Sequence, residues 1–179
     1  MRRSRAAVVN RQLVIVVCRG NIGRSPFAEA VLNGELSRRN LNEKIGVISR
    51  GVQGTSVDPE PVKFSNITYY PEMYKDAKPV LDALSIDLSA HVSTPINEAD
   101  AKAANILLAV DGKTREGLAS LFPDQVSKIH LISELVNQNR DIVDPEGVSG
   151  ADKQRQIFTD LRNIALAGFP KLLVLLDVE

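Results

Sequence analysis

The chain has 179 residues, of which 44% are apolar and 25% charged, an ordinary balance for a soluble globular protein. Its 22 basic and 22 acidic side chains cancel, which argues against a chain-wide surface for nucleic acid or membranes. No apolar run, Leu172 to Leu176 included, is long enough to span a bilayer. The composition therefore predicts a globular protein that binds neither nucleic acid nor membranes.

The chain begins with a basic stretch, residues 1–11, that lacks the apolar core of a secretory signal. We expect a mobile tail there, with organelle targeting as the alternative, followed by a single domain over residues 12–179. The one cysteine, Cys18, excludes an internal disulfide and a thiolate metal cluster. A cytoplasmic location is the expectation that follows.

Strand and helix patterns alternate along the chain. The β-branched run at 13–17 predicts a buried central strand, and further strands are expected at 46–49, 104–110 and 129–132. Helices are expected at 26–39, near 77–84, after Thr94-Pro95, near 113–121 and from about 151, the last one bent or interrupted at Pro170. The alternation predicts an α/β three-layer sandwich, a four-stranded parallel sheet with helices on both faces. Ligands of such folds bind at the carboxyl ends of the strands.

The segment Cys18-Arg19-Gly20-Asn21-Ile22-Gly23-Arg24-Ser25 follows the first predicted strand and opens the first helix. Inward N–H groups of such a loop and the positive end of the helix dipole form an anion site suited to phosphate. Gly20 and Gly23 let the backbone curl tightly, and Asn21 tolerates left-handed geometry. The planar guanidinium of Arg24 can bind two phosphate oxygens.

The same loop predicts nucleophilic chemistry at Cys18. A thiol that faces a helix N-terminus and a guanidinium is favoured as a thiolate. Its in-line attack on a bound phosphate would give a phosphocysteine intermediate. The Ser25 hydroxyl is placed to hydrogen-bond the sulfur when it leaves. The alternative, a small buried packing residue, is common for a single cysteine, but the glycine loop with Arg24 favours catalysis.

Phosphatase chemistry also needs an acid for the leaving oxygen. Asp144 is the best source, because Pro145 holds it in an extended or turn conformation on a loop. Once deprotonated, the same carboxylate would activate the water that hydrolyses the intermediate. An ordinary Asp-Pro turn is the alternative, and Asp58-Pro59 is a competing dipeptide. Because thiolate, guanidinium and carboxylate suffice, we expect no metal and no organic cofactor.

These residues make the chain resemble the low-molecular-weight protein tyrosine phosphatases from about residue 13 to about residue 173. That family has a Cys-x5-Arg-Ser loop near its N-terminus and an Asp-Pro acid loop near its C-terminus, as at Cys18–Ser25 and Asp144–Pro145. Segments 86–91 and 106–111 also resemble the family. The resemblance implies the same fold and phosphotyrosine protein substrates, and we expect a monomer or weak dimer.

The resemblance also implies supporting residues. Asn21, Ser25, Ser49 and His91 would form the hydrogen-bond network that holds the phosphate loop, although His91 could instead be a surface residue. Asp111 would support the loop or its arginine, or else be a simple turn residue after a strand.

Several positions depart from the family pattern. Gly23 stands where a second cysteine usually protects the nucleophile, so Cys18 is expected to overoxidise under peroxide. Arg19 replaces a small or apolar residue, and would favour acidic substrates or point to solvent. Glu146 stands where tyrosines often line the pocket. Tyr69 or Tyr70, in an unusually long segment at 51–74, would replace that aromatic wall or else anchor the loop.

The same residues bear on three alternative activities. Ile22 favours phosphotyrosine over phosphoarginine, because the related phosphoarginine phosphatases have a smaller polar residue there. An arsenate reductase of this fold would relay oxidation through further cysteines, which the chain lacks. A non-catalytic phosphoprotein-binding module would need neither Cys18 nor Asp144. The sequence thus predicts a cysteine-dependent protein tyrosine phosphatase.

Overall fold

The computed structural model describes residues 11–148 and 150–178. Within them, a four-stranded sheet has the order β2-β1-β3-β4, and all its neighbouring strands are parallel. The strands are β1 (Gln12–Cys18), β2 (Ile45–Gly51), β3 (Ile106–Ala109) and β4 (Ile129–Leu131). The predicted parallel sheet is confirmed.

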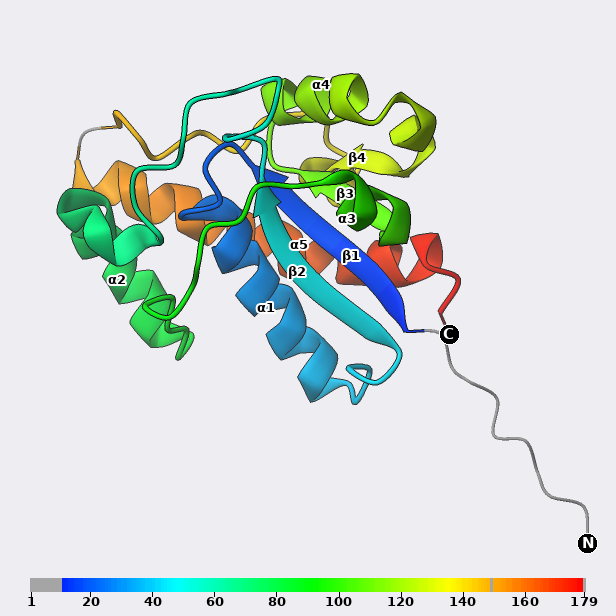
Figure 1. Cartoon of the computed structure of the whole chain (residues 1–179). Helices are drawn as coiled ribbons and strands as arrows, with labels where there is room; N and C mark the ends of the chain where they lie inside the picture. Colours follow the sequence, from blue (N-terminus) through cyan, green and yellow to red (C-terminus); the bar gives the residue numbers. More distant parts are fainter. Residues whose placement is uncertain (1–10, 149, 179) are drawn as a thin grey trace, which may run out of the picture.

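Helices cover both faces of the sheet. Figure 1 shows α1, α2 and α5 on one side and α3 and α4 on the other, which confirms the three-layer arrangement. The α-helices are α1 (Arg24–Arg38), α2 (Pro71–Ala83), α3 (Glu98–Ala103), α4 (Gly112–Leu121) and α5 (Ala151–Leu175). Short 3₁₀ helices are η1 (Ile67–Tyr69), η2 (Pro123–Lys128) and η3 (Ile132–Val136). None of the helices in the described ranges is both long and apolar enough to cross a membrane.

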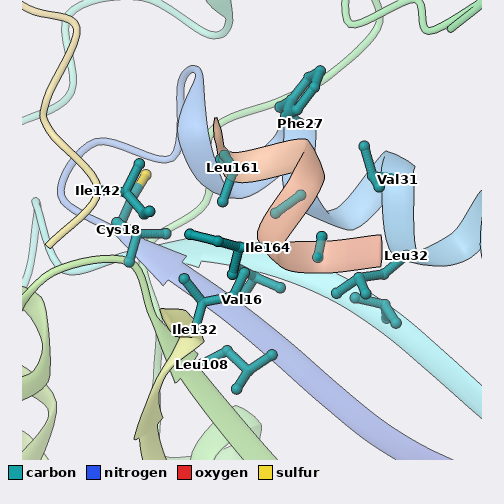
Figure 2. Close-up of a cluster of buried hydrophobic side chains, with 14 of the residues drawn as sticks. Val16, Cys18, Phe27, Val31, Leu32, Leu108, Ile132, Ile142, Leu161 and Ile164 are labelled. Carbon is teal, nitrogen blue, oxygen red and sulfur yellow. The ribbon is translucent and has the colours of Figure 1, made fainter. Parts of the chain in front are cut away.

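The central strand β1 supplies side chains to both layers of the core. Val14, Val16 and Cys18 pack in the cluster that α1 and α5 cover, whereas Ile15 and Val17 pack in the cluster on the α3–α4 side. Such alternation follows from the two-residue period of a strand. Figure 2 shows Val16 and Cys18 with Leu161 and Ile164 of α5 in the first cluster. Cys18 is thus the last residue of a strand that is buried from Val14 onward.

Thr94-Pro95 does not open a helix, so that prediction is wrong. Helix α3 begins at Glu98, where Asn97 and Asp100 form a reciprocal capping box. Thr94 runs beside the end of β2 instead, because Gly51 donates to its carbonyl at 3.0 Å and accepts from Ile96 at 2.8 Å. This pairing holds the segment extended and brings it next to the phosphate loop.

Three helix boundaries also differ from the predictions. Helix α1 begins at Arg24, and α2 begins at Pro71 rather than near Ala77. Helix α5 continues through Pro170 to Leu175, because Pro170 lies on the exposed face while its neighbour Phe169 is fully buried in the core. The predicted tail falls on residues 1–11, of which residues 1–10 lie outside the described ranges.

Candidate active site

The candidate site lies at the carboxyl edge of the sheet. Cys18 ends β1 beside Gly51, the last residue of β2, and Asp111 follows β3. The loop after Cys18 leads directly into α1, whose N-cap Gly23 makes no side-chain capping bond. The first amides of a helix have no intrahelical partner, so those of α1 are available to an anion.

Asn21 fixes the conformation of this loop. Its φ of 53° places it in the left-handed region, which Asn tolerates better than most residues. Its Nδ2 donates to Ser25 Oγ at 3.0 Å and to Ser49 Oγ at 2.9 Å. His91 Nε2 donates to its backbone carbonyl at 2.8 Å. The structure therefore brings together the four residues of the predicted network.

Further contacts of the loop were not predicted. Ser93 Oγ donates to the Gly20 carbonyl at 2.7 Å, and the Thr94 amide donates to Asn21 Oδ1 at 2.9 Å. A side chain at Gly51 would place its Cβ only 2.7 Å from the Arg19 carbonyl, so this close approach requires glycine. The extended 93–95 segment and the end of β2 thus hold the phosphate loop from outside.

The sulfur of Cys18 is surrounded by donors. Asn21 donates its backbone N–H to Sγ at 3.2 Å, and Ser25 Oγ lies 3.0 Å from Sγ. Because Ser25 accepts from Asn21, its own proton is left for the sulfur or for the Arg50 carbonyl 3.3 Å away. Hydrogen bonds of this kind favour a negatively charged sulfur.

Arg24 is buried and bound on both sides. Its guanidinium donates to Asp111 Oδ2 at 2.6 Å, to the Ile142 carbonyl at 2.7 Å and to Asp144 Oδ2 at 2.5 Å. Burial by itself lowers the pKa of Arg24, but attraction to Cys18, Asp144 and Asp111 outweighs burial and raises it. The guanidinium is therefore charged and lies close to Cys18.

Asp111 binds Arg24 and also caps helix α4. Its Oδ1 accepts from the Thr114 amide at 2.7 Å and caps α4, while its Oδ2 binds Arg24. Burial raises the pKa of Asp111, but the hydrogen bonds from Thr114 and the charge of Arg24 together lower it. The rigid start of α4 thus orients the arginine.

Asp144 reaches the site from the segment before α5. One oxygen binds Arg24, and the other accepts from the Glu146 amide at 3.1 Å. Its side chain is 42% exposed, so it stays accessible to a substrate at the pocket mouth. Phosphate oxygens would compete with Asp144 for Arg24, which would free the carboxyl for proton transfer.

Arg19 pairs with acidic side chains of this protein, a contact that the sequence did not predict. It binds Asp58 and Glu60, each at 2.8 Å, and approaches Glu146 at 3.8 Å, while its side chain stays 32% exposed. Asp58, the competing Asp-Pro acid, is thereby engaged by Arg19. Three carboxylates around one guanidinium make this side of the mouth acidic.

Aromatic residues from the long 51–74 segment line the pocket. Its volume is about 390 Å³, and its lining includes Cys18, Ile22, Arg24, Phe64, Tyr70 and Asp144. Tyr69 stands outside this lining, 57% exposed and stacked on Phe64 at 5.8 Å between ring centroids. Phe64 also meets Tyr70 edge to face at 5.5 Å. Of the two predicted tyrosines, Tyr70 reaches the pocket, and Phe64 was not predicted.

A larger groove of about 840 Å³ adjoins this pocket and shares Arg19, Arg24 and Asp144 with it. Cys18 lines the smaller cavity, which is therefore the candidate catalytic pocket. Across residues 11–148 and 150–178, no group of three or more His, Cys, Asp or Glu side chains is arranged to hold a metal ion.

Sequence comparisons relate the chain to known phosphatases. Residues 13–173 match the family model for "Low molecular weight phosphotyrosine protein phosphatase". The probable low molecular weight protein-tyrosine-phosphatase EpsP of Ralstonia nicotianae is 27% identical over 135 residues, 74% of this chain and 77% of that protein. The protein-arginine-phosphatase of Bacillus subtilis is 30% identical over 140 residues, 76% of this chain and 81% of that protein.

Comparisons with solved structures point to the same family as the sequence comparisons. The low molecular weight protein tyrosine phosphatase from T. tengcongensis superposes with a TM-score of 0.73 at 26% identity, covering 89% of this chain and 99% of that one. A mutant of YwlE from Bacillus subtilis gives 0.69 at 27% identity, with 90% and 98% covered. By the span of the family match and this shared fold, the chain belongs to the low molecular weight phosphotyrosine protein phosphatase family.

Proposed function

We propose that this phosphatase hydrolyses protein phosphotyrosine through a phosphocysteine on Cys18. The observation that carries the proposal is the make-up of the pocket. Cys18 and Arg24 lie with the start of α1 at its base, and Ile22, Phe64 and Tyr70 line it. The base suits a phosphate group, and the lining suits an aromatic ring.

In the first step, the Cys18 thiolate attacks phosphorus. An S–P bond forms while the bond from phosphorus to the tyrosine oxygen breaks. Arg24 exchanges Asp144 for phosphate oxygens and stabilises the transferring group. Asp144, protonated at this stage, gives its proton to the leaving oxygen, so that neutral tyrosine departs.

In the second step, Asp144 acts as a base. It takes a proton from a water molecule whose oxygen attacks phosphorus, and the S–P bond breaks. The Ser25 hydroxyl, held by Asn21, donates to the sulfur as it leaves as a thiolate. Inorganic phosphate is released, and Asp144 is protonated again for the next cycle.

The choice between phosphotyrosine and phosphoarginine rests on the pocket wall. The related enzyme of Bacillus subtilis is a protein-arginine-phosphatase, so family membership alone allows either substrate. The lining includes the apolar or aromatic side chains of Ile22, Phe64, Met73 and Tyr70, together with polar side chains such as Gln53, Glu60 and Lys63. Where the N–H groups of a phosphoguanidinium face the first four side chains they would lose water, which costs free energy, whereas a phenyl ring loses little.

Paired peptides test this proposal. We expect kcat/KM for a phosphotyrosine peptide to exceed that for a phosphoarginine peptide of the same sequence by at least about tenfold. Ile22→Thr should shrink that ratio. A higher kcat/KM on phosphoarginine would overturn the phosphotyrosine assignment. No turnover of p-nitrophenyl phosphate at mildly acidic pH would instead favour a non-catalytic phosphoprotein-binding module.

The aromatic residues of the pocket predict how three alanine substitutions should change KM. Phe64→Ala and Tyr70→Ala should each raise KM for a phosphotyrosine peptide by about three- to tenfold, because each removes a ring that contacts the substrate ring. Tyr69→Ala is the matched control and should change KM less, since Tyr69 lies behind Phe64. Steady-state kinetics that are unchanged in Phe64→Ala and Tyr70→Ala would show that these rings only anchor the loop.

The glycine at position 23, in place of a second cysteine, predicts that Cys18 is sensitive to oxidation. Because Cys18 is the only cysteine, peroxide should inactivate the enzyme in a way that dithiothreitol reverses poorly. A Cβ at Gly23 would lie in ordinary contact, 3.4 Å from Met73 Sδ and farther from other atoms, so Gly23→Cys should be accommodated. That variant should regain most of its activity after reduction, with Gly23→Ser as its control. If the wild type, Gly23→Cys and Gly23→Ser recover the same fraction of activity after reduction, the prediction is contradicted.

A further inference from the structure

The first turn of α5 carries a buried amide beside the acid loop, which we define as residues 142–148. Gln154 is only 5% exposed. Its Nε2 donates to the Pro145 carbonyl at 2.6 Å and to the Val148 carbonyl at 2.9 Å. Both hydrogens of one amide are therefore used on the loop that carries Asp144.

Burying an amide is costly unless its hydrogen bonds are made. An apolar residue of similar size would fill this position in α5 without that cost. The two carbonyls of the acid loop account for the amide group, because each accepts one of its hydrogens, whereas the buried Oε1 has no hydrogen-bond partner within the described residues. We propose that Gln154 is a positioning residue that holds the acid loop so that Asp144 reaches the leaving oxygen. The inference rests on the proposed role of Asp144.

Hydrogen bonds attach the acid loop to the rest of the protein on both sides of Asp144. On the N-terminal side of Asp144, the buried Ile142 donates its amide to the Val110 carbonyl at 2.9 Å. On the C-terminal side, Val148 donates to Pro145 at 3.2 Å and closes a turn, and Gln154 binds both carbonyls of that turn. Gln154 thus fastens the turn to a long helix.

Substrate binding makes this attachment more important. The direct contact between Asp144 and Arg24 is given up when the guanidinium turns to phosphate. The bonds of Gln154 involve no atom of Cys18 or Arg24, so they persist in the substrate complex. Without them, the carboxyl would sample more positions and protonate the leaving oxygen less often.

The dependence on the leaving group separates this role from general stabilisation. Phenol is a poor leaving group that needs protonation, whereas p-nitrophenol leaves more easily as its anion. We expect Gln154→Leu to lower kcat/KM for phenyl phosphate by about tenfold and for p-nitrophenyl phosphate by about threefold or less. Gln156→Leu, an exposed neighbour on the same helix, is the control and should change neither value.

A double-mutant cycle completes the test. If Gln154 acts through Asp144, adding Gln154→Leu to Asp144→Ala should cause no further loss with either substrate. Equal losses for both substrates, or a further loss in the double variant, would overturn the inference. Gln154→Met, which keeps the length without the donors, serves in the same way if Gln154→Leu folds poorly. If Asp144→Ala itself shows no dependence on the leaving group, the proposed acid is wrong, which is a distinct outcome.

Discussion

Cys18→Ser is expected to lower kcat/KM for p-nitrophenyl phosphate and for phosphotyrosine peptides by at least about 10⁴-fold. The sulfur of Cys18 accepts a hydrogen bond from the Asn21 amide and lies beside the Ser25 hydroxyl. This environment favours a thiolate. A serine hydroxyl in the same place is a much weaker nucleophile than a thiolate, and the two groups that contact the sulfur, the Asn21 amide and the Ser25 hydroxyl, are not bases. Initial rates with both substrates measure the loss.

Phosphate binding is the control for this variant. The amides at the start of α1 and the guanidinium of Arg24 are unchanged in Cys18→Ser, so inorganic phosphate should still bind. Loss of the negative sulfur should even strengthen binding, because like charges repel. Titration calorimetry would show this as an equal or lower Kd. Residual activity within tenfold of the wild type would rule out Cys18 as the nucleophile.

The parts of the site that could be predicted are local in sequence. The segment from Cys18 to Ser25 contains its own strand end, glycines and helix start, so its conformation follows from residues next to one another. The parallel sheet was also predictable, because buried strands have continuous β-branched runs. The family resemblance added Ser49 and His91, which the structure places on Asn21.

The parts that could not be predicted depend on contacts between distant segments. Arg19 looks like a free cation in the sequence, yet its partners Asp58, Glu60 and Glu146 come from two other loops. Thr94 has the sequence of a helix cap, but pairing with the end of β2 overrides that preference.

The contact of Gln154 with the acid loop was not predicted for the same reason. A polar residue in the first turn of a helix is usually exposed, and nothing in its neighbours indicates that it is buried against the acid loop. Phe64 likewise lies in a polar segment and becomes part of the pocket only when that segment folds over the loop. Local patterns thus predicted the base of the pocket, whereas its mouth required the structure.

Arg24→Lys is expected to lower kcat/KM for phosphotyrosine peptides by about 10²- to 10³-fold while the protein stays folded. A lysine keeps the positive charge near Asp111 and Asp144, so neither carboxylate loses its countercharge altogether. Its single ammonium cannot bind two phosphate oxygens in one plane or donate to three acceptors as the guanidinium does. The loss should therefore appear in catalysis more than in thermal stability.

Arg50→Lys provides the matched comparison. Arg50 also binds a carboxylate with its guanidinium, since Nε donates to Asp100 Oδ2 at 2.9 Å, but it is not part of the pocket lining. The same substitution there should leave kcat/KM within about twofold of the wild type, since part-exposed ion pairs contribute little. If Arg24→Lys behaves like Arg50→Lys, charge alone suffices at the base of the pocket. If only Arg24→Lys fails, the planar geometry of the guanidinium is what the transferring phosphate requires.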